Sequence, residues 1–280
     1  KESRDERERK AAVWLMQEFS PLDRRISLEG VGLIRFRPVE PAEWDPPGFL
    51  QDAPWNMSQG DVRNLIHLLL NTLRWQSTHT YLLSGRVDLL KDESFAPRQK
   101  AFYVRQSTGV TKKDYGVLSW VPQGFSNARL ELIQKWLIAE RGLDPEHSKE
   151  HAKRILPELW TYLTNSTSPW GGYLVSETVG REGVLFRLDH RMWELEVTEF
   201  NSQASWHICD RCQNLSHVNL GNICPVYGCT GHLQPIGPNL DVLQDNLYRD
   251  IYSHGEAIPM HTEEHTAQWV PTKAAEIQNK

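Results

Sequence analysis

Four closely spaced cysteines are the feature that most restricts how this chain of 280 residues can fold. They form two pairs, Cys209-Asp-Arg-Cys212 and Cys224-Pro-Val-Tyr-Gly-Cys229, with eleven residues between the pairs. A Cys-x-x-Cys turn directs two sulfur atoms toward one ion, and zinc takes four such ligands in a tetrahedron. We therefore predict that Cys209, Cys212, Cys224 and Cys229 bind one zinc ion.

Gly221 and Gly228 support this prediction, because glycine permits the backbone turns that such loops require. Two disulfide bonds would instead need an oxidising compartment, and nothing in the sequence suggests secretion. An iron–sulfur cluster can also use four cysteines. One histidine in place of a cysteine would also complete a zinc site, and the nearby histidines are His207, His217 and His232. Four thiolates leave no position for water, so we expect a structural zinc ion rather than a catalytic one.

The charge balance argues against a protein that binds nucleic acid through an overall positive charge. The net charge is −5 and the isoelectric point is near 6.1, whereas non-specific binding to DNA depends on lysines and arginines that neutralise phosphates. Any contact with phosphates must then come from a local patch. The candidates are Arg24, Arg25, Arg181 and Arg187, each of which could equally be a solvated surface charge.

The sequence contains no membrane-spanning run and opens without a signal peptide, which predicts a cytoplasmic protein without membrane contact. The eleven tryptophans are spread along the chain, and we expect most of them to pack in the core.

Apolar periodicity predicts an α+β fold, with helices and strands in separate runs. The expected helices cover residues 1–19, 61–74 capped by Asp61, 126–142 capped by Ser126 and ended by Gly142, and 145–164. Pro157 should break the last of these helices or start a new turn. The expected strands lie within residues 26–39, in a hairpin of residues 173–179 and 184–188, and over residues 193–198.

These elements suggest four segments. Residues 1–125 form a mixed α/β region, and residues 126–200 combine helices with a β-hairpin. The second segment resembles the winged-helix plan, in which helices pack on a small β-wing. Residues 201–240 form the four-cysteine module, which we expect to be similar to a zinc ribbon. Residues 241–280 form the last segment.

The last segment resembles the start of the second motor lobe of large prokaryotic superfamily 2 DEAD/DEAH-box helicases. The resemblance rests on His265-Thr-Ala-Gln268 and on a predicted helix over residues 273–278 that carries Glu276. The cysteine module and, more loosely, residues 20–30 are similar to regions that repair or phage-defence helicases carry between motor motifs. An alternative metal site at His261, Glu263, Glu264 and His265 lacks the His-x-x-x-His spacing of zincins.

This resemblance implies a zinc-stabilised accessory region of an ATP-dependent DNA helicase, with DNA and the motor lobes as partners. The chain itself has no Gly-x-x-x-x-Gly-Lys-Ser/Thr motif and no Asp-Glu-x-His motif, so the ATPase activity would belong to the parent enzyme. The alternative is a protein–protein docking module with a structural zinc ion and exposed tryptophans as anchors.

Overall fold

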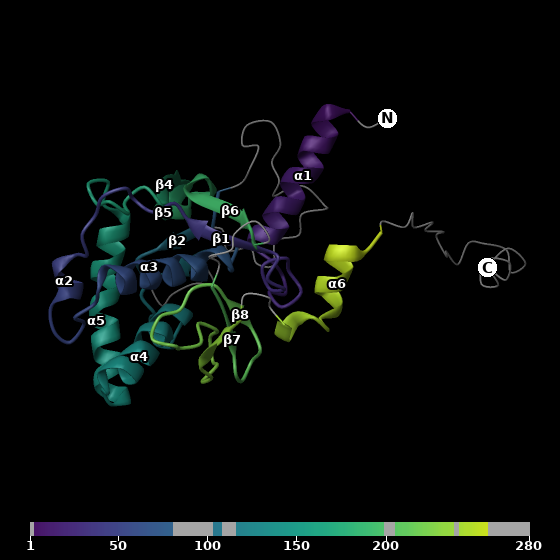
Figure 1. Cartoon of the computed structure of the whole chain (residues 1–280). Coiled ribbons are helices and arrows are strands. Elements are labelled where there is room, and N and C mark those ends of the chain that lie inside the picture. Colours follow the sequence, from purple (N-terminus) through teal and green to yellow (C-terminus); the bar gives the residue numbers. More distant parts are fainter. Residues whose placement is uncertain (1–2, 81–102, 108–115, 199–204, 238–240, 257–280) are drawn as a thin grey trace, which may run out of the picture.

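The computed structural model describes residues 3–80, 103–107, 116–198, 205–237 and 241–256, and these form a mixed α+β fold, as predicted (Figure 1). The helices are α1 (Arg4–Phe19), α2 (Gly48–Gln51), α3 (Gln59–Arg74), α4 (Ala128–Arg141), α5 (Pro145–Thr164) and α6 (Leu247–His254). The strands are β1 (Ile34–Pro38), β2 (Tyr103–Arg105), β3 (Val117–Ser119), β4 (Leu174–Val179), β5 (Gly183–Leu188), β6 (Trp193–Val197), β7 (Trp206–Cys209), β8 (Leu215–Ser216) and β9 (Leu233–Ile236).

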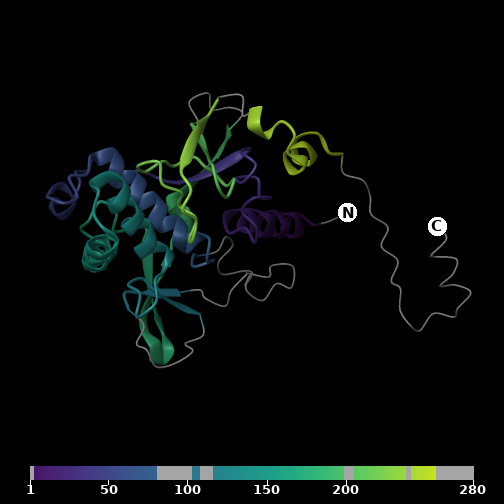
Figure 2. The same ribbon diagram turned by 90° about the horizontal axis from the view of Figure 1, so that it is seen from below.

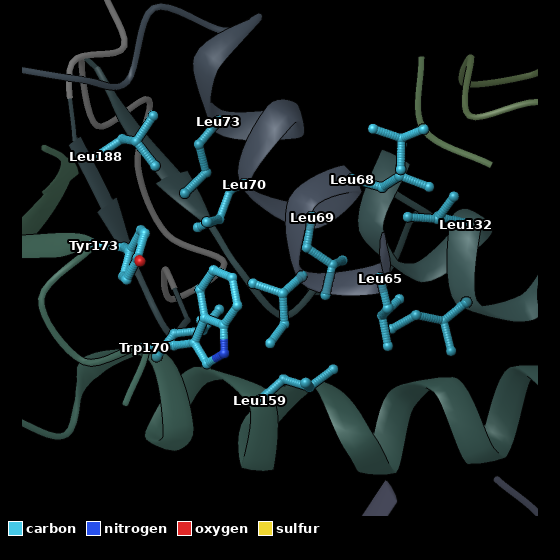
Figure 3. Packing of buried hydrophobic residues seen from close by; sticks show 14 of the residues in the cluster. Leu65, Leu68, Leu69, Leu70, Leu73, Leu132, Leu159, Trp170, Tyr173 and Leu188 are labelled. Atoms are coloured by element: carbon cyan, nitrogen blue, oxygen red, sulfur yellow. The ribbon is translucent and has the colours of Figure 1, made fainter. Parts of the chain in front are cut away.

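Helix α3 lies at the centre of the structure and is buried on almost every side. Figure 3 shows its leucines surrounded by Leu132 of α4, Leu159 of α5 and Leu188 of β5. The helix begins two residues earlier than predicted, because Ser58 rather than Asp61 is the N-cap. The Ser58 hydroxyl accepts from the Asp61 amide at 3.1 Å, and the Asp61 carboxylate accepts from the Ser58 amide at 3.1 Å.

Two other helix predictions also need correction at single residues. Helix α4 is capped by Asn127, whose side-chain oxygen accepts from the Leu130 amide at 2.9 Å, and not by Ser126. Gly142 ends α4 in the left-handed region with φ of 63°, as predicted. Helix α5 runs without a break through Pro157. Its buried apolar face extends on both sides of that proline, and this burial outweighs the missing backbone hydrogen bond.

The strands in the described ranges pair into three sheets. The predicted hairpin is confirmed, since β4 and β5 pair antiparallel within a sheet of order β3-β2-β5-β4. The predicted strand over residues 26–39 is confined to β1, which pairs antiparallel with β6. In this register Arg35 lies opposite Glu196 and Arg37 opposite Glu194, so opposite charges face each other across the strands. The third sheet has the order β8-β7-β9.

Strands β7 and β8 lie on one side of α3 and the β4–β5 hairpin lies on the other, as the two views in Figures 1 and 2 show. Most of the described tryptophans are core residues, as predicted. The buried ones are Trp44, Trp55, Trp120, Trp136, Trp160, Trp170 and Trp206. Trp14 is the clear exception, with an exposed fraction of 66%.

Replacing Pro157 by alanine should stabilise the protein, because alanine restores the missing amide donor inside α5. A proline in a helix interior costs about 3 kcal/mol, but it also restricts the unfolded chain, which offsets part of that cost. We therefore expect the alanine variant to unfold with a free energy about 1–2 kcal/mol higher than that of the wild type. Pro145→Ala is the matched control, since the first helical position needs no amide donor. Urea denaturation of both variants measures the effect, and a loss of stability in Pro157→Ala would contradict the prediction.

Candidate metal centre

The first cysteine pair begins at Cys209, the last residue of β7, and the chain then turns tightly back toward β8. The Gln213 amide donates to the Cys209 carbonyl at 3.1 Å, and Gln213 lies in the left-handed region with φ of 59°. The Cys209 Sγ accepts from the Arg211 amide at 3.4 Å and from the Cys212 amide at 3.5 Å. Backbone amides directed at a sulfur atom stabilise the thiolate form.

The second pair forms a comparable turn next to β9. The Cys229 amide donates to the Val226 carbonyl at 3.1 Å, and Gly228 has a φ of 76° that favours glycine. The Cys229 Sγ accepts from the Gly231 amide at 3.4 Å, and the Cys224 amide donates to the Gly231 carbonyl at 3.3 Å. Gly231 therefore connects both cysteines of this pair.

The four sulfur atoms form one cluster, in which all lie within 4.8 Å of one another. The Sγ atoms of Cys209 and Cys229 are 3.7 Å apart, and those of Cys212 and Cys224 are 3.6 Å apart. A zinc–sulfur bond of about 2.3 Å places tetrahedral ligands about 3.8 Å from one another, whereas a disulfide bond measures about 2.05 Å. The cluster could therefore hold a metal ion, and its geometry is consistent with zinc. A multinuclear iron–sulfur cluster would need wider spacing, because iron and sulfide lie between the cysteines.

The three nearby histidines have other partners among the described residues, and none belongs to the cluster. The His217 Nε2 lies 3.2 Å from Glu29 Oε1, and the His207 Nε2 lies 3.2 Å from the Asn219 side-chain nitrogen. The His232 side chain is exposed, with an exposed fraction of 62%.

The surroundings of the sulfur atoms favour metal binding at Cys212. Burial alone raises the pKa of the Cys212 thiol, but hydrogen bonds from the Asn214 backbone and side-chain amides outweigh burial and lower the pKa to about 7. Burial raises the pKa of Cys209 and of Cys224, which are enclosed by the protein. A metal ion would have to displace the protons of these two thiols, which makes metal binding dependent on pH.

The cysteine module packs directly on the central helices. Val218, Leu220 and Ile223 belong to the same apolar core cluster as α3, α4 and α5. The Lys135 ammonium of α4 donates to the Val226 carbonyl at 3.0 Å, and the Glu131 carboxylate accepts from the Gly228 amide at 2.7 Å. The divisions predicted at residues 125, 200 and 240 stay predictions.

A buried charged network links the module to α3. Glu29 Oε2 lies 2.5 Å from the Arg74 guanidinium, and Glu29 Oε1 lies 3.2 Å from His217. Arg74 is completely buried and also donates to Asn71 at 2.8 Å and to the Phe19 carbonyl at 3.0 Å. Burial raises the pKa of Glu29, but Arg74 and His217 outweigh burial and hold the pKa well below its usual range. Sequence reasoning missed this network, because its members are far apart in the chain.

The four arginines predicted to contact DNA are not brought together. Arg24 is partly buried with its guanidinium 4.1 Å from the centre of the Trp75 ring. Arg25 is exposed and paired with Asp23 at 3.0 Å. Arg181 is exposed in the turn between β4 and β5, and Arg187 of β5 pairs with Glu177 and lies over the Tyr103 ring at 4.7 Å. Their contact with phosphates stays a prediction.

The motifs predicted over residues 261–280 lie outside the described residues, and so does the alternative metal site at His261, Glu263, Glu264 and His265. None of the helices in the described ranges combines the length and the apolar character that a membrane crossing requires. Comparison with protein-family models, with curated proteins and with solved structures finds no match for this chain.

Replacing Gly231 by alanine should disrupt the cluster. The added Cβ would lie 2.6 Å from both Cys209 Sγ and Asp210 Oδ1 and 2.7 Å from Arg211 Cβ, so the first cysteine turn would have to move. Such overpacking costs about 1–3 kcal/mol, and we expect weaker metal binding as well. Gly237→Ala is the control, because nothing lies within 4 Å of its added Cβ. Metal titration and thermal denaturation of both variants test this, and equal behaviour would refute it.

Replacing Glu29 by glutamine should destabilise the fold strongly, because it leaves Arg74 buried without its counter-charge. Breaking a buried ion pair in this way costs about 3–5 kcal/mol. The contribution of Glu29 is present above its unfolded pKa, near 4.5, and is lost as the pH falls toward the lower folded value. The difference in unfolding free energy between wild type and variant should therefore shrink in acid. Glu8→Gln on the exposed side of α1 is the control, and a similar loss in that variant would contradict the assignment.

Proposed function

We propose that the four cysteines bind one structural zinc ion and that β7, β8 and β9 form a zinc-ribbon-like module around it. The observation that carries this proposal is the convergence of four sulfur atoms within 4.8 Å. All four ligand positions would be filled by protein sulfur atoms, so the ion would be closed to water and would act by holding the module together.

We further propose that this zinc-stabilised chain is an accessory region of a cytoplasmic, ATP-dependent DNA helicase and contributes to nucleic-acid handling beside the motor lobes. The sequence resemblance described above supports this function. The combination of α4, α5 and the β4–β5 hairpin supports a winged-helix-like role, with the exposed Arg181 at the tip of the hairpin. Arg187 lies on β5 of the same hairpin.

A protein-docking module is the second candidate, and exposed apolar side chains favour it. Phe125 has an exposed fraction of 94%, and Tyr227 of the second cysteine turn has an exposed fraction of 55% and donates to the neighbouring Ser126 carbonyl at 3.3 Å. On α6, Leu247 and Ile251 have exposed fractions of 65% and 50%. Leu247 and Ile251 are four residues apart and so share one face of α6, and exposed apolar faces are common where proteins contact partners.

The zinc proposal predicts about one equivalent of zinc per chain after purification under reducing conditions. Cys212→Ser should lose the metal and lower the melting temperature, because a structural zinc ion contributes on the order of 10 kcal/mol to such folds. Ser216→Ala, in the same module but outside the cluster, is the control and should keep the metal. Full thermal stability of Cys212→Ser after removal of zinc would contradict a structural role.

The helicase proposal predicts weak DNA binding by this acidic chain alone and stronger binding beside the motor lobes. If Arg181 and Arg187 contact phosphates, replacing both by glutamine should reduce the salt dependence of binding by roughly two units in the log–log slope. Lys153→Gln with Arg154→Gln, on the exposed side of α5, is the matched control of equal charge. The measurement is a salt titration of single-stranded and duplex DNA binding with the chain and its parent. If neither the chain nor its parent binds DNA, the result would favour the docking function.

A further inference from the structure

A polar cavity of about 310 Å³ lies where the cysteine module meets the body of the protein. Its walls come from β1, α3 and the segment that carries β7 and β8. The polar residues that line it are Arg35, Arg37, Glu40, Arg63, Asn64, His67, Ser205, His207, His217 and Asn219. Ligand-binding cavities begin at about this size, and a few polar groups usually fix the orientation of the ligand.

Three arginines line this cavity, and each of them is paired with a glutamate. Arg35 pairs with Glu196 at 2.6 Å, and Arg63 pairs with Glu40 at 3.3 Å. Arg37 pairs with Glu194 at 3.0 Å and also with Glu196 at 2.5 Å. Glu40 lines the cavity, whereas Glu194 and Glu196 lie on β6 behind the wall, so three carboxylates balance the charge of the three guanidinium groups. Each guanidinium has five N–H donors, and these ion pairs leave donors of each group available to a ligand.

Two histidine ring nitrogens of the same wall are buried without a hydrogen-bond partner among the described residues. His67 has an exposed fraction of 7%; its ring donates to the Phe36 carbonyl, and its Nε2 has no partner. The Nε2 of His207 lies against the Asn219 side-chain nitrogen, and its Nδ1 has no partner. Buried polar atoms of this kind are rare in folded proteins and usually indicate a role or a partner.

The donor set does not fit a cation. Three guanidinium groups repel a metal ion, and among the described residues the histidines form no group that could ligate one. Arginine forks match the oxygen geometry of phosphate, and several forks around one cavity give charge-assisted hydrogen bonds from different directions. Amide groups of Asn64 and Asn219 lie in the same wall. The arginine donors of the cavity therefore fit an anion, and the unpartnered Nε2 of His67 is left to accept a hydrogen bond from a hydroxyl or amine of the same ligand.

We propose that this cavity binds a phosphate group, carried either by a free nucleotide or by the backbone of a nucleic-acid strand. Arg37 and Arg63, whose side chains are about half exposed, meet the phosphate at the mouth, and the more buried Arg35 lies deeper. This site is separate from the metal centre, and it does not require the helicase function proposed above.

Isothermal titration of the full chain tests the proposal with inorganic phosphate, a nucleoside monophosphate and a short single-stranded oligonucleotide. We expect saturable binding of phosphate that Arg63→Gln and Arg37→Gln each weaken roughly tenfold, the usual effect of losing a charge-assisted hydrogen bond. Arg63→Lys should retain part of the affinity. Arg154→Gln, on α5 away from the cavity, is the control and should bind as the wild type does. Zinc content and melting temperature, measured for every variant, separate a folding defect from a binding defect.

The two sources of phosphate give different results. Tighter binding of the nucleoside monophosphate than of inorganic phosphate, without competition by the oligonucleotide, identifies a free nucleotide. Competition by the oligonucleotide that is lost in Arg63→Gln identifies a strand. Absence of binding of all three probes, or equal affinities in Arg63→Gln and Arg154→Gln, would overturn the proposal.

Discussion

The near-complete burial of α3 is the constraint on which the rest of the structure depends. A helix that is apolar on most sides must be covered on most sides, and α4, α5, β5 and part of the cysteine module share that task. The same burial encloses polar residues of α3, which then need partners inside the protein. Arg74 meets this requirement through Glu29, Asn71 and the Phe19 carbonyl.

These partners determine how the cysteine module is attached. Glu29 bonds to Arg74 and to His217 at the same time, so one carboxylate joins the central helix to the segment between the two cysteine pairs. Asn64 of α3 adds a second connection, since its amide donates to the Asn219 carbonyl at 2.8 Å. Apolar contacts between the module and the body bury surface from water, and these directional hydrogen bonds fix the orientation of the module on the body.

Features determined by neighbouring residues could be predicted from the sequence, and features determined by distant ones could not. The cysteine spacing predicted the cluster, and periodicity predicted α1, α3, α4, α5 and the hairpin. Helix starts were misjudged by one or two residues, because Ser58 and Asn127 compete with neighbours that are also good caps. The pairing of β1 with β6 and the Glu29–Arg74 bond join residues far apart in sequence, so no local pattern reveals them. Helix α5 likewise continues past Pro157, because its apolar face is buried on both sides of a residue that by itself disfavours a helix interior.

The cysteine cluster and the cavity are connected through the chain. Residues 213–223 form a loop whose two ends are fixed by Cys212 and Cys224, and this loop carries His217 and Asn219, which line the cavity. With the four sulfur atoms held at one ion, the loop has few conformations available in the folded state, and its bonds to Glu29 and Asn64 form at little further cost in entropy. Without the ion, nothing would hold the four sulfur atoms to one another, and both ends of the loop would loosen. One wall of the cavity would therefore depend on the proposed metal ion, although no cavity residue belongs to the cysteine cluster.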